Sequence, residues 1–297
     1  MPGVRIARDI EYIHRMRVAS RRARSALQLF GECFPAKLHR RWQKGVRAVT
    51  RSLGLARDLD VQIDVLKNFR KEHDTPEYKV GVNHVLYHIR QKRRDVQSDV
   101  LKNLDNIERR GTLHEISLYL QESLRQYSIN IQERSSPFIL HRARSYIVEQ
   151  LEAVLEYEPY VDQEDADDEL HQMRIAAKRL RYTMEIFADL YGDGLNVYIK
   201  AVKKIQKYLG EMHDCVVWLS YLPKFIKVEK KHIVRYKDAE QRLKSIIQGV
   251  HLFEVDRKQT RLTRYRNFYE HWQRIKADGL FTTLRAYLTD KTVGTKN

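Results

Sequence analysis

The sequence has few of the residues that interrupt helices or cross-link a chain. Its 297 residues include 12 glycines, 6 prolines and 2 cysteines, Cys33 and Cys215. Two cysteines exclude a disulfide framework and a zinc site made of thiolates, which fits a reducing compartment, and we expect both to be buried and without a role. No apolar run reaches the length of a membrane-spanning helix, and the N-terminus lacks the apolar stretch of a signal peptide. We therefore expect a soluble, cytoplasmic protein.

Acidic residues are scarce relative to basic ones. The chain has 55 Lys and Arg against 39 Asp and Glu, which gives a net charge of +16 at pH 7. This imbalance predicts a polyanionic partner. Hydrophobic residues make up 42% of the chain, enough for a buried core, so we do not expect wholesale disorder. Because strand-type alternation is missing and the amphipathic stretches are long, the predicted fold class is all-α.

Two segments of the chain occur twice, in the same order. HRMRVASRRAR at 14–24 returns as HQMRIAAKRLR at 171–181, and LGLARD at 53–58 returns as LGEMHD at 209–214. A shared order of motifs at nearly fixed spacing indicates an internal duplication. We expect a single domain of two docked helix bundles, with repeats at 1–134 and 135–297.

Each repeat is predicted to begin with two helices joined by a turn. The turn lies at 31–35 in the first repeat and at 192–194 in the second. Glycine just past a helix end is a common stop signal, so the second helix is expected to end at Gly54 or at Gly210.

The segments that follow are predicted to be helical as well. Asp58 and Asp214 are placed to cap a third helix, and amphipathic segments follow at about 77–110 and 229–275. The acidic stretch at 162–169 is predicted to join the repeats and to open the first long helix of the second, because carboxylates favour a helix N-terminus. An alternative interpretation makes this stretch an internal mimic of a bound polyanion.

Basic residues recur on one face of two helices in each repeat. At about 100° per residue, the cations of the first helix share a face: His14, Arg17, Arg21 and Arg24, and in the second repeat His171, Arg174, Lys178 and Arg181. The opposite face is predicted to form the core: Met16, Ala19, Ala23, Leu27 and Phe30, and Met173, Ala176, Leu180, Met184 and Phe187. The second helices carry Lys44, Arg47 and Arg51, matched by Lys200, Lys203 and Lys207, while Arg57 is matched by His213.

These basic rows differ from an ordinary solvated helix face, which is the alternative for any one row taken alone. Between Tyr12 and Arg57 the only acidic residue is Glu32, so neighbouring cations repel one another unless an anion compensates. A row about 15 Å long, rich in arginine, is suited to an extended phosphate chain. The histidines add donors if they are protonated, or serve as neutral hydrogen-bonding groups.

Three other functions have weaker support in the sequence. A hydrolase needs a nucleophile or a metal with carboxylates, but no phosphate-cradling glycine loop and no H-E-x-x-H helix is present. His213-Asp214 resembles the dipeptide of metal-dependent phosphohydrolases, yet its twin Arg57-Asp58 does not ligate a metal in that way. We therefore expect no enzymatic activity, no cofactor and no metal, with a polyphosphate hydrolase as an alternative. A peripheral membrane role is weaker still.

Nucleic-acid binding is the stronger rival. The segment 264–272 mixes basic and aromatic residues, as single-strand binders do. Because Tyr265, Phe268, Tyr269 and Trp272 occur at helical spacing, core packing is the favoured role for these rings.

The repeated motifs resemble the signature of the conserved histidine α-helical domain (CHAD) family. The resemblance covers nearly the whole chain and implies two four-helix bundles, related by a pseudo-twofold axis, around a central basic cavity that binds inorganic polyphosphate. It implies a site made by His14, Arg17, Arg21, Arg22, Arg24, His171, Arg174, Lys178, Arg179 and Arg181. The second helices and the LG motifs would extend it with Lys44, Arg47, Arg51, Arg57, Lys200, Lys203, Lys207 and His213.

The resemblance also suggests association with polyphosphate granules. The resemblance does not indicate a protein partner. Some later basic residues have no internal match and no assigned role: Arg93, Arg94, Arg257, Arg261 and Arg264.

Overall fold

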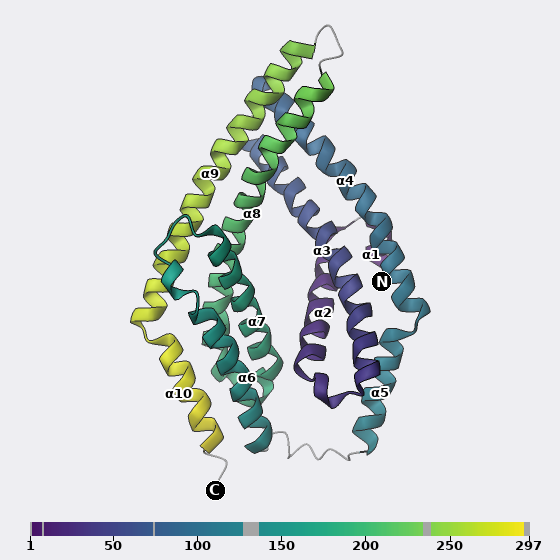
Figure 1. Ribbon diagram of the computed structural model, residues 1–297, viewed down its shortest axis with the longest axis vertical. Coiled ribbons are helices and arrows are strands. Elements are labelled where there is room, and N and C mark those ends of the chain that lie inside the picture. The colour runs from purple at the N-terminus through teal and green to yellow at the C-terminus, as the bar shows by residue number, and fades with distance from the viewer. Residues whose placement is uncertain (1, 8, 74, 127–136, 234–238, 294–297) are drawn as a thin grey trace. The chain divides into compact units, whose positions relative to one another are not determined.

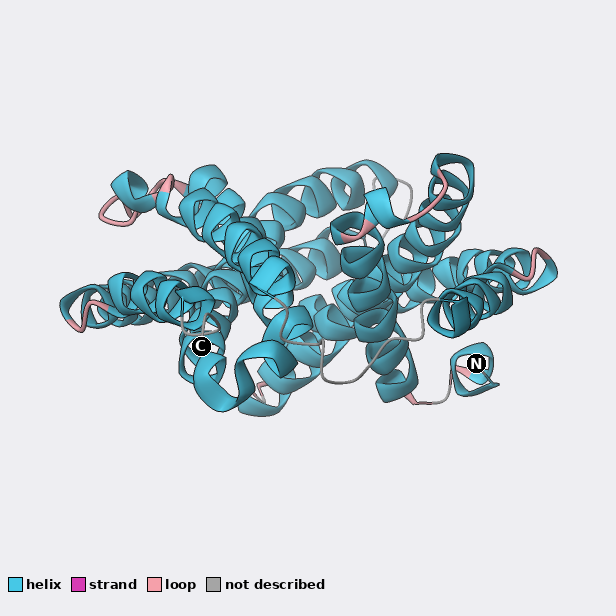
Figure 2. Ribbon diagram, turned by 90° about the horizontal axis from the view of Figure 1, so that it is seen from below, coloured by secondary structure: helices cyan, strands magenta, loops and turns pink. Residues whose placement is uncertain are grey.

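The computed structural model describes residues 2–7, 9–73, 75–126, 137–233 and 239–293, and every regular element in these ranges is a helix (Figures 1 and 2). The all-α prediction is confirmed. The chain divides into two compact units: unit 1 comprises 1–128 and 226–253, and unit 2 comprises 129–225 and 254–297. None of the described helices is long and apolar enough to cross a membrane.

Unit 1 is built on three helices packed side by side (Figure 1). Its elements are α1 (Pro2–Ile6), α2 (Ile10–Leu29), the short 3₁₀ helix η1 (Gly31–Cys33), α3 (Ala36–Glu72), α4 (Pro76–Arg109) and α5 (Thr112–Gln126), with the end of α8 (Asn196–Ile233) and the start of α9 (Ala239–Ala277). Asp9 caps α2 by accepting a hydrogen bond from the Glu11 backbone N–H at 2.8 Å. Trp42, Leu53 and Leu104 are fully buried where α3 meets its neighbours.

Unit 2 contains the second copy of the repeated motifs. Its elements are α6 (Pro137–Leu155), η3 (Glu158–Tyr160), α7 (Asp167–Tyr191), η4 (Gly192–Leu195), α10 (Leu280–Val293) and the remaining parts of α8 and α9. Helix α7 packs along α6, which also contacts α10. The predicted apolar face of α7 is confirmed, because all five of its residues are buried: Met173, Ala176, Leu180, Met184 and Phe187.

The matching face of α2 in unit 1 is only partly buried, contrary to the prediction. Leu27 is buried and Met16 and Phe30 are half-buried, but Ala19 and Ala23 are exposed. Alanine side chains are too short to reach the neighbouring apolar residues of α3, α4 and α5, and an apolar pocket of about 180 Å³ remains between them.

The predicted helix ends at Gly54 and Gly210 are wrong. Helix α3 runs unbroken from Ala36 to Glu72 and α8 from Asn196 to Ile233, so both glycines are helix-interior. Asp58 and Asp214 therefore lie within these helices and cap nothing. A glycine stops a helix only when the backbone beyond it turns away, and here the surrounding side chains keep the chain helical.

The turns between the first two helices of each repeat are confirmed. Helix α2 ends at Leu29 and η1 follows at once. Helix α7 ends at Tyr191, and Gly192 has φ of 57°, the left-handed region that favours glycine.

Two segments predicted from the sequence have different boundaries or roles in the structure. The acidic stretch at 162–169 opens α7 as expected, since Asp167, Asp168 and Glu169 form its first turn, but it lies inside unit 2 and does not join the units. The predicted segment at 229–275 begins too early, because α8 continues to Ile233 and α9 begins at Ala239. The predicted repeat boundary at 134/135 lies outside the described residues.

The two cysteines differ in exposure. Cys215 is buried, and burial raises the pKa of its thiol to about 11. Cys33 in η1 is exposed, contrary to the prediction, because the turn that carries it lies on the surface.

Candidate functional site

The basic rows of α2 and α3 meet in one pocket of unit 1. This pocket has a volume of about 420 Å³ and is lined by Arg17, Arg21 and Arg24 of α2 together with Arg47, Thr50, Arg51, Gly54, Leu55 and Asp58 of α3. Five guanidinium groups from two adjacent helices thus surround one cavity. The helical phase inferred from the sequence places all five on the pocket side.

A second, larger pocket adjoins the first along α3. Its volume is about 770 Å³, and it shares Arg47, Arg51 and Leu55 with the smaller pocket. Its remaining lining residues come from α3 and α4: Arg40, Gln43, Lys44, Ala48, Ser52, Asp99, Lys102, Asn103 and Asn106. Together the two pockets form a continuous cationic surface, the arginine pocket, along one side of α3.

Most cations of the arginine pocket are not neutralised by the protein. Arg17 donates a hydrogen bond to Asp58 at 3.1 Å. Within the part of the chain that the structure describes, no carboxylate pairs with the other four arginines of the smaller pocket: Arg21, Arg24, Arg47 and Arg51. Like charges held close together repel, so a bound multivalent anion would stabilise this arrangement.

Gly54 and Gly210 each lie beside an arginine of the neighbouring helix. A Cβ at Gly54 would lie 3.8 Å from Nε of Arg17, and a Cβ at the matching Gly210 would lie 3.2 Å from Nε of Arg174. The repeated glycines therefore mark the places where the arginine of the neighbouring helix crosses α3 or α8.

Other predicted residues of the first repeat lie outside the linings of both pockets. His14 and Arg22 are exposed. Arg57 is half-buried, and its Nη1 atom is buried with no hydrogen-bond partner among the described residues. A buried guanidinium N–H without a partner is costly, and an anion or a water molecule would satisfy it.

In unit 2 the positions that match His14 and Arg57 of the first repeat hold a histidine pair. The rings of His171 on α7 and His213 on α8 stack, with their centroids 3.8 Å apart. Burial, with the charges of Arg174 and Lys178, lowers the pKa of His171. Burial and the neighbouring His171, Arg174 and Lys178 lower the pKa of His213 to about 4. Both rings are therefore neutral at pH 7, so neither member of this pair is a protonated donor in the free protein.

The remaining cations of the second repeat are more solvated or are partnered. Arg179, Lys200 and Lys203 are exposed. Arg181 lies 4.8 Å above the ring of Tyr182, and its Nε lies 3.6 Å from Glu185. Lys207 lies 4.0 Å from Glu211.

Four of the five later basic residues form ion pairs inside their own unit. Their partners and distances are Arg93 with Asp60 at 2.7 Å, Arg261 with Asp167 at 2.8 Å, Arg264 with Glu211 at 2.9 Å, and Arg257 with Asp256 at 2.8 Å. Arg94 is exposed. The buried pairs of Arg93 and Arg261 show that these two residues support the fold.

Sequence reasoning missed two cations of the larger pocket, Arg40 and Lys102. Arg40 precedes Lys44 by one turn and extends the same row, so its spacing contained the signal. Lys102 comes from α4 and lies outside the repeated motifs, so those motifs did not point to it.

The aromatic residues of segment 264–272 are mostly core. Tyr265, Phe268 and Trp272 are buried, which confirms the packing interpretation for these three, while Tyr269 is 37% exposed. The rings of this segment are thus largely inaccessible for stacking against nucleic-acid bases.

Comparison with known proteins identifies the family. No curated protein matches the chain. Among solved structures, the crystal structure of the CHAD domain from the plant Ricinus communis is similar, with a TM-score of 0.63 and 22% identity over 91% of this chain and 83% of that one. This likeness supports the fold. The sequence profile of the CHAD domain matches residues 1–223, and the chain therefore belongs to the CHAD domain family.

Proposed function

We propose that the protein binds inorganic polyphosphate, without hydrolysing it, in the arginine pocket of unit 1. The observation that carries the proposal is the convergence of five arginines from α2 and α3 on one cavity. Guanidinium groups bind phosphate oxygens through paired, charge-assisted hydrogen bonds. A chain of phosphates supplies one negative charge per unit and so matches a row of such groups.

The extent of the cationic surface favours a long ligand. The larger pocket shares Arg47 and Arg51 with the smaller one, so an extended anion can follow α3 from one to the other. A single phosphate ion would contact only a few of these groups. Binding of a chain would release condensed counterions and weaken with rising salt.

Two acidic residues near the smaller pocket contact arginines, which favours binding without hydrolysis. Asp58 accepts a hydrogen bond from Arg17, and Asp60 is buried against Arg93. Their role here is to orient or neutralise arginine.

The proposal rests on unit 1 alone. Three expectations stay predictions from the sequence: that the two repeats face each other across one cavity, that the second repeat contributes to binding, and that the protein associates with polyphosphate granules. Nucleic acid is the rival ligand, and the burial of the aromatic rings at 264–272 weakens that alternative.

The test is calorimetric titration with long-chain polyphosphate, with DNA and RNA at matched phosphate concentration, over a salt series. The variant Arg21→Glu with Arg51→Glu reverses two cations of the pocket that have no carboxylate partner among the described residues. The matched control, Arg15→Glu with Lys71→Glu, makes the same charge change on the same two helices, at exposed positions outside both pocket linings.

We expect the pocket variant to lose polyphosphate binding, and the control to retain it. A partial loss would appear as a fall of roughly 1.4 in the slope of log K against log salt, about 0.7 for each phosphate contact removed. Equal weakening in both variants, or equally salt-sensitive binding of all three polymers, would reduce the pocket to a generic basic surface. Release of free phosphate during the titration would instead favour the hydrolase.

A further inference from the structure

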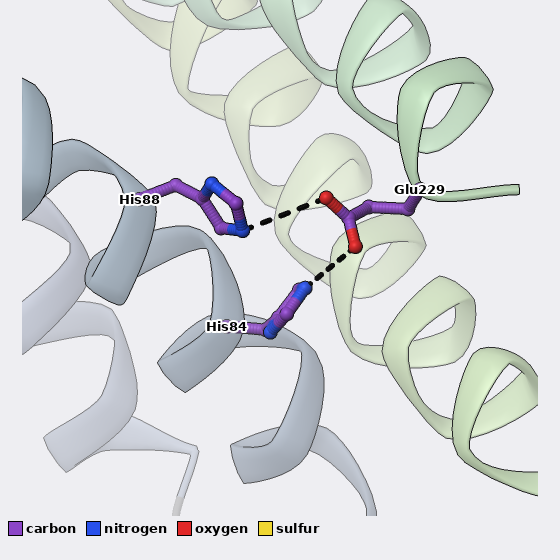
Figure 3. A group of neighbouring side chains, drawn as sticks. All are labelled: His84, His88 and Glu229. Atoms are coloured by element: carbon purple, nitrogen blue, oxygen red, sulfur yellow. Dashed lines mark hydrogen bonds and ion pairs between the residues drawn. The ribbon is translucent and has the colours of Figure 1, made fainter. Parts of the chain in front are cut away.

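A group of three potential metal ligands lies in unit 1, apart from the arginine pocket. His84 and His88 project from one face of α4, one helical turn apart, and Glu229 faces them from α8 (Figure 3). Nε2 of His84 lies 2.7 Å from one carboxylate oxygen of Glu229, and Nε2 of His88 lies 3.5 Å from the other. Among the described residues this is the only group of three such side chains whose ligand atoms all lie within 4.8 Å of one another.

The carboxylate of Glu229 is unusually buried. Its side chain is only 8% exposed, and both of its oxygens are directed at imidazole nitrogens. Burying a carboxylate is costly unless it is paired with a cation or fully hydrogen-bonded. One hydrogen bond from His84 satisfies one oxygen, but the 3.5 Å separation from His88 is too long for a strong hydrogen bond.

The backbone next to the group is tightly packed. Gly81, one turn before His84, lies so close to α9 that a Cβ there would fall 2.4 Å from the carbonyl oxygen of Ile246. The opposing Gly249 shows the same closeness, since its Cβ would fall 2.5 Å from the carbonyl oxygen of Tyr78. This glycine-to-glycine crossing fixes α4 against α9 in unit 1, so the two histidines project from a rigid position.

The donor set matches a specific class of ion. Two imidazole nitrogens and one carboxylate are the protein ligands of many zinc sites, in which a water molecule takes the fourth position. With ligand bonds of about 2.0–2.1 Å, tetrahedral coordination separates neighbouring ligand atoms by roughly 3.4 Å. Nε2 of His88 lies 3.5 Å from one carboxylate oxygen, close to this value, whereas the 2.7 Å between Nε2 of His84 and the other oxygen is a hydrogen-bond distance that must widen to admit an ion. Because the three ligand atoms all lie within 4.8 Å of one another, side-chain shifts would bring them into coordination geometry.

We propose that His84, His88 and Glu229 form a binding site for a divalent transition-metal ion of the Zn²⁺ class, with one coordination position open to water. No metal site was expected from the sequence. Imidazole donors favour Zn²⁺, Co²⁺ or Ni²⁺ over Mg²⁺ and Ca²⁺, which prefer sites made entirely of oxygen. The ion would neutralise the buried carboxylate and join α4 to α8 within unit 1. The site shares no residue with the arginine pocket, so either proposal can fail without the other.

The test is titration of the metal-free protein with Zn²⁺ by calorimetry and with Co²⁺ by visible absorption, whose intensity reports the coordination number. The informative variant is His88→Gln, because His88 is 39% exposed and its loss leaves the hydrogen bond between His84 and Glu229 in place. The matched control is His114→Gln, at an exposed histidine of α5. The circular dichroism and melting of each metal-free variant report whether the fold is retained.

We expect one Zn²⁺ per chain in the wild type and in the control. In His88→Gln we expect the affinity for Zn²⁺ to fall on the order of 100-fold or more, which is a larger loss than removal of a residue that only supports a ligand would cause. Co²⁺ should give the intense absorption of four-coordination, and Mg²⁺ and Ca²⁺ should not compete. Absence of stoichiometric Zn²⁺ binding, or binding of equal affinity in His88→Gln, would overturn the proposal. If His88→Gln unfolds, Glu229→Gln, which keeps the shape of the side chain, provides the same comparison.

Discussion

The histidine pair of unit 2 predicts a specific loss of stability in acid. His171 and His213 stack in a partly buried position between α7 and α8, with Arg174 and Lys178 nearby. Burial and these cations lower the pKa of His213 to about 4 and also lower the pKa of His171. In the unfolded chain a histidine has a pKa near 6.5. Between these values the unfolded state binds more protons than the folded state, so the free energy of unfolding rises with pH.

The magnitude follows from the shift of His213. A fall from 6.5 to about 4 corresponds to roughly 3 kcal/mol at about 1.4 kcal/mol per pKa unit. Because the side chain is still partly exposed and solvent screens its neighbours, we expect about 1–2 kcal/mol. This stability is fully present above pH 6.5, is lost as the pH falls to about 4, and does not change further below that through this group.

The assay is urea unfolding at a series of pH values from 7.5 to 4, with the histidine ring signals followed by NMR in parallel. The variant His213→Gln removes the titrating group and should flatten the stability profile in this window, whereas the control His114→Gln should follow the wild type. If His213→Gln and the wild type lose stability in parallel, or if the His213 ring titrates near 6.5, the assignment of a neutral buried pair is wrong.

The same histidine pair offers a test of whether the second repeat contributes to polyphosphate binding. A phosphate chain near His171 and His213 would favour their protonated forms and raise both pKa values. If the second repeat contributes to binding, as the sequence predicts, binding at pH 6 takes up protons and the heat of titration depends on the ionisation enthalpy of the buffer. A buffer-independent heat would mean that bound polyphosphate does not contact the pair.

Two further predictions concern stability. Gly54→Ala should stabilise the protein by about 0.5–1 kcal/mol in urea unfolding, because its new Cβ meets only an ordinary contact and a helix-interior glycine is unfavourable. Gly210→Ala should gain less or lose stability, since its Cβ would lie 3.2 Å from Arg174; equal gains at both positions would contradict the crossing geometry. Arg93→Met should destabilise by about 3–5 kcal/mol by leaving buried Asp60 without its partner, and adding Asp60→Leu should recover most of that loss.

The helical architecture and the placement of the basic rows were predictable from the sequence. Periodicity decides which side chains share a face, and the arginines of α2 and α3 accordingly lie along one pocket. The apolar face of α7 was predictable for the same reason. The matching face of α2 was not, because the reach of Ala19 and Ala23 depends on how far away the neighbouring helices lie.

The sequence-based predictions were wrong or incomplete where the structure of a segment depends on residues far away in the sequence. Gly54 and Gly210 were interpreted as helix ends because glycine often follows a helix, but each lies where an arginine of another helix crosses. The group around Glu229 was missed for a related reason. His84 and His88 show helical spacing in the sequence, yet the carboxylate that completes the group is 145 residues from His84.

The two repeats have matched sequences but different electrostatic states. At the position where the first repeat has Arg57, a permanent cation, the second has His213, whose pKa is lowered to about 4. Likewise His14 is exposed, whereas its twin His171 is half-buried and stacked. The first repeat is therefore strongly cationic at any physiological pH, since arginine does not deprotonate. The second keeps permanent cations such as Arg174 and Arg179 but adds two groups that gain charge only when acid or an anion supplies the driving force, so the charge of the second repeat depends more strongly on pH.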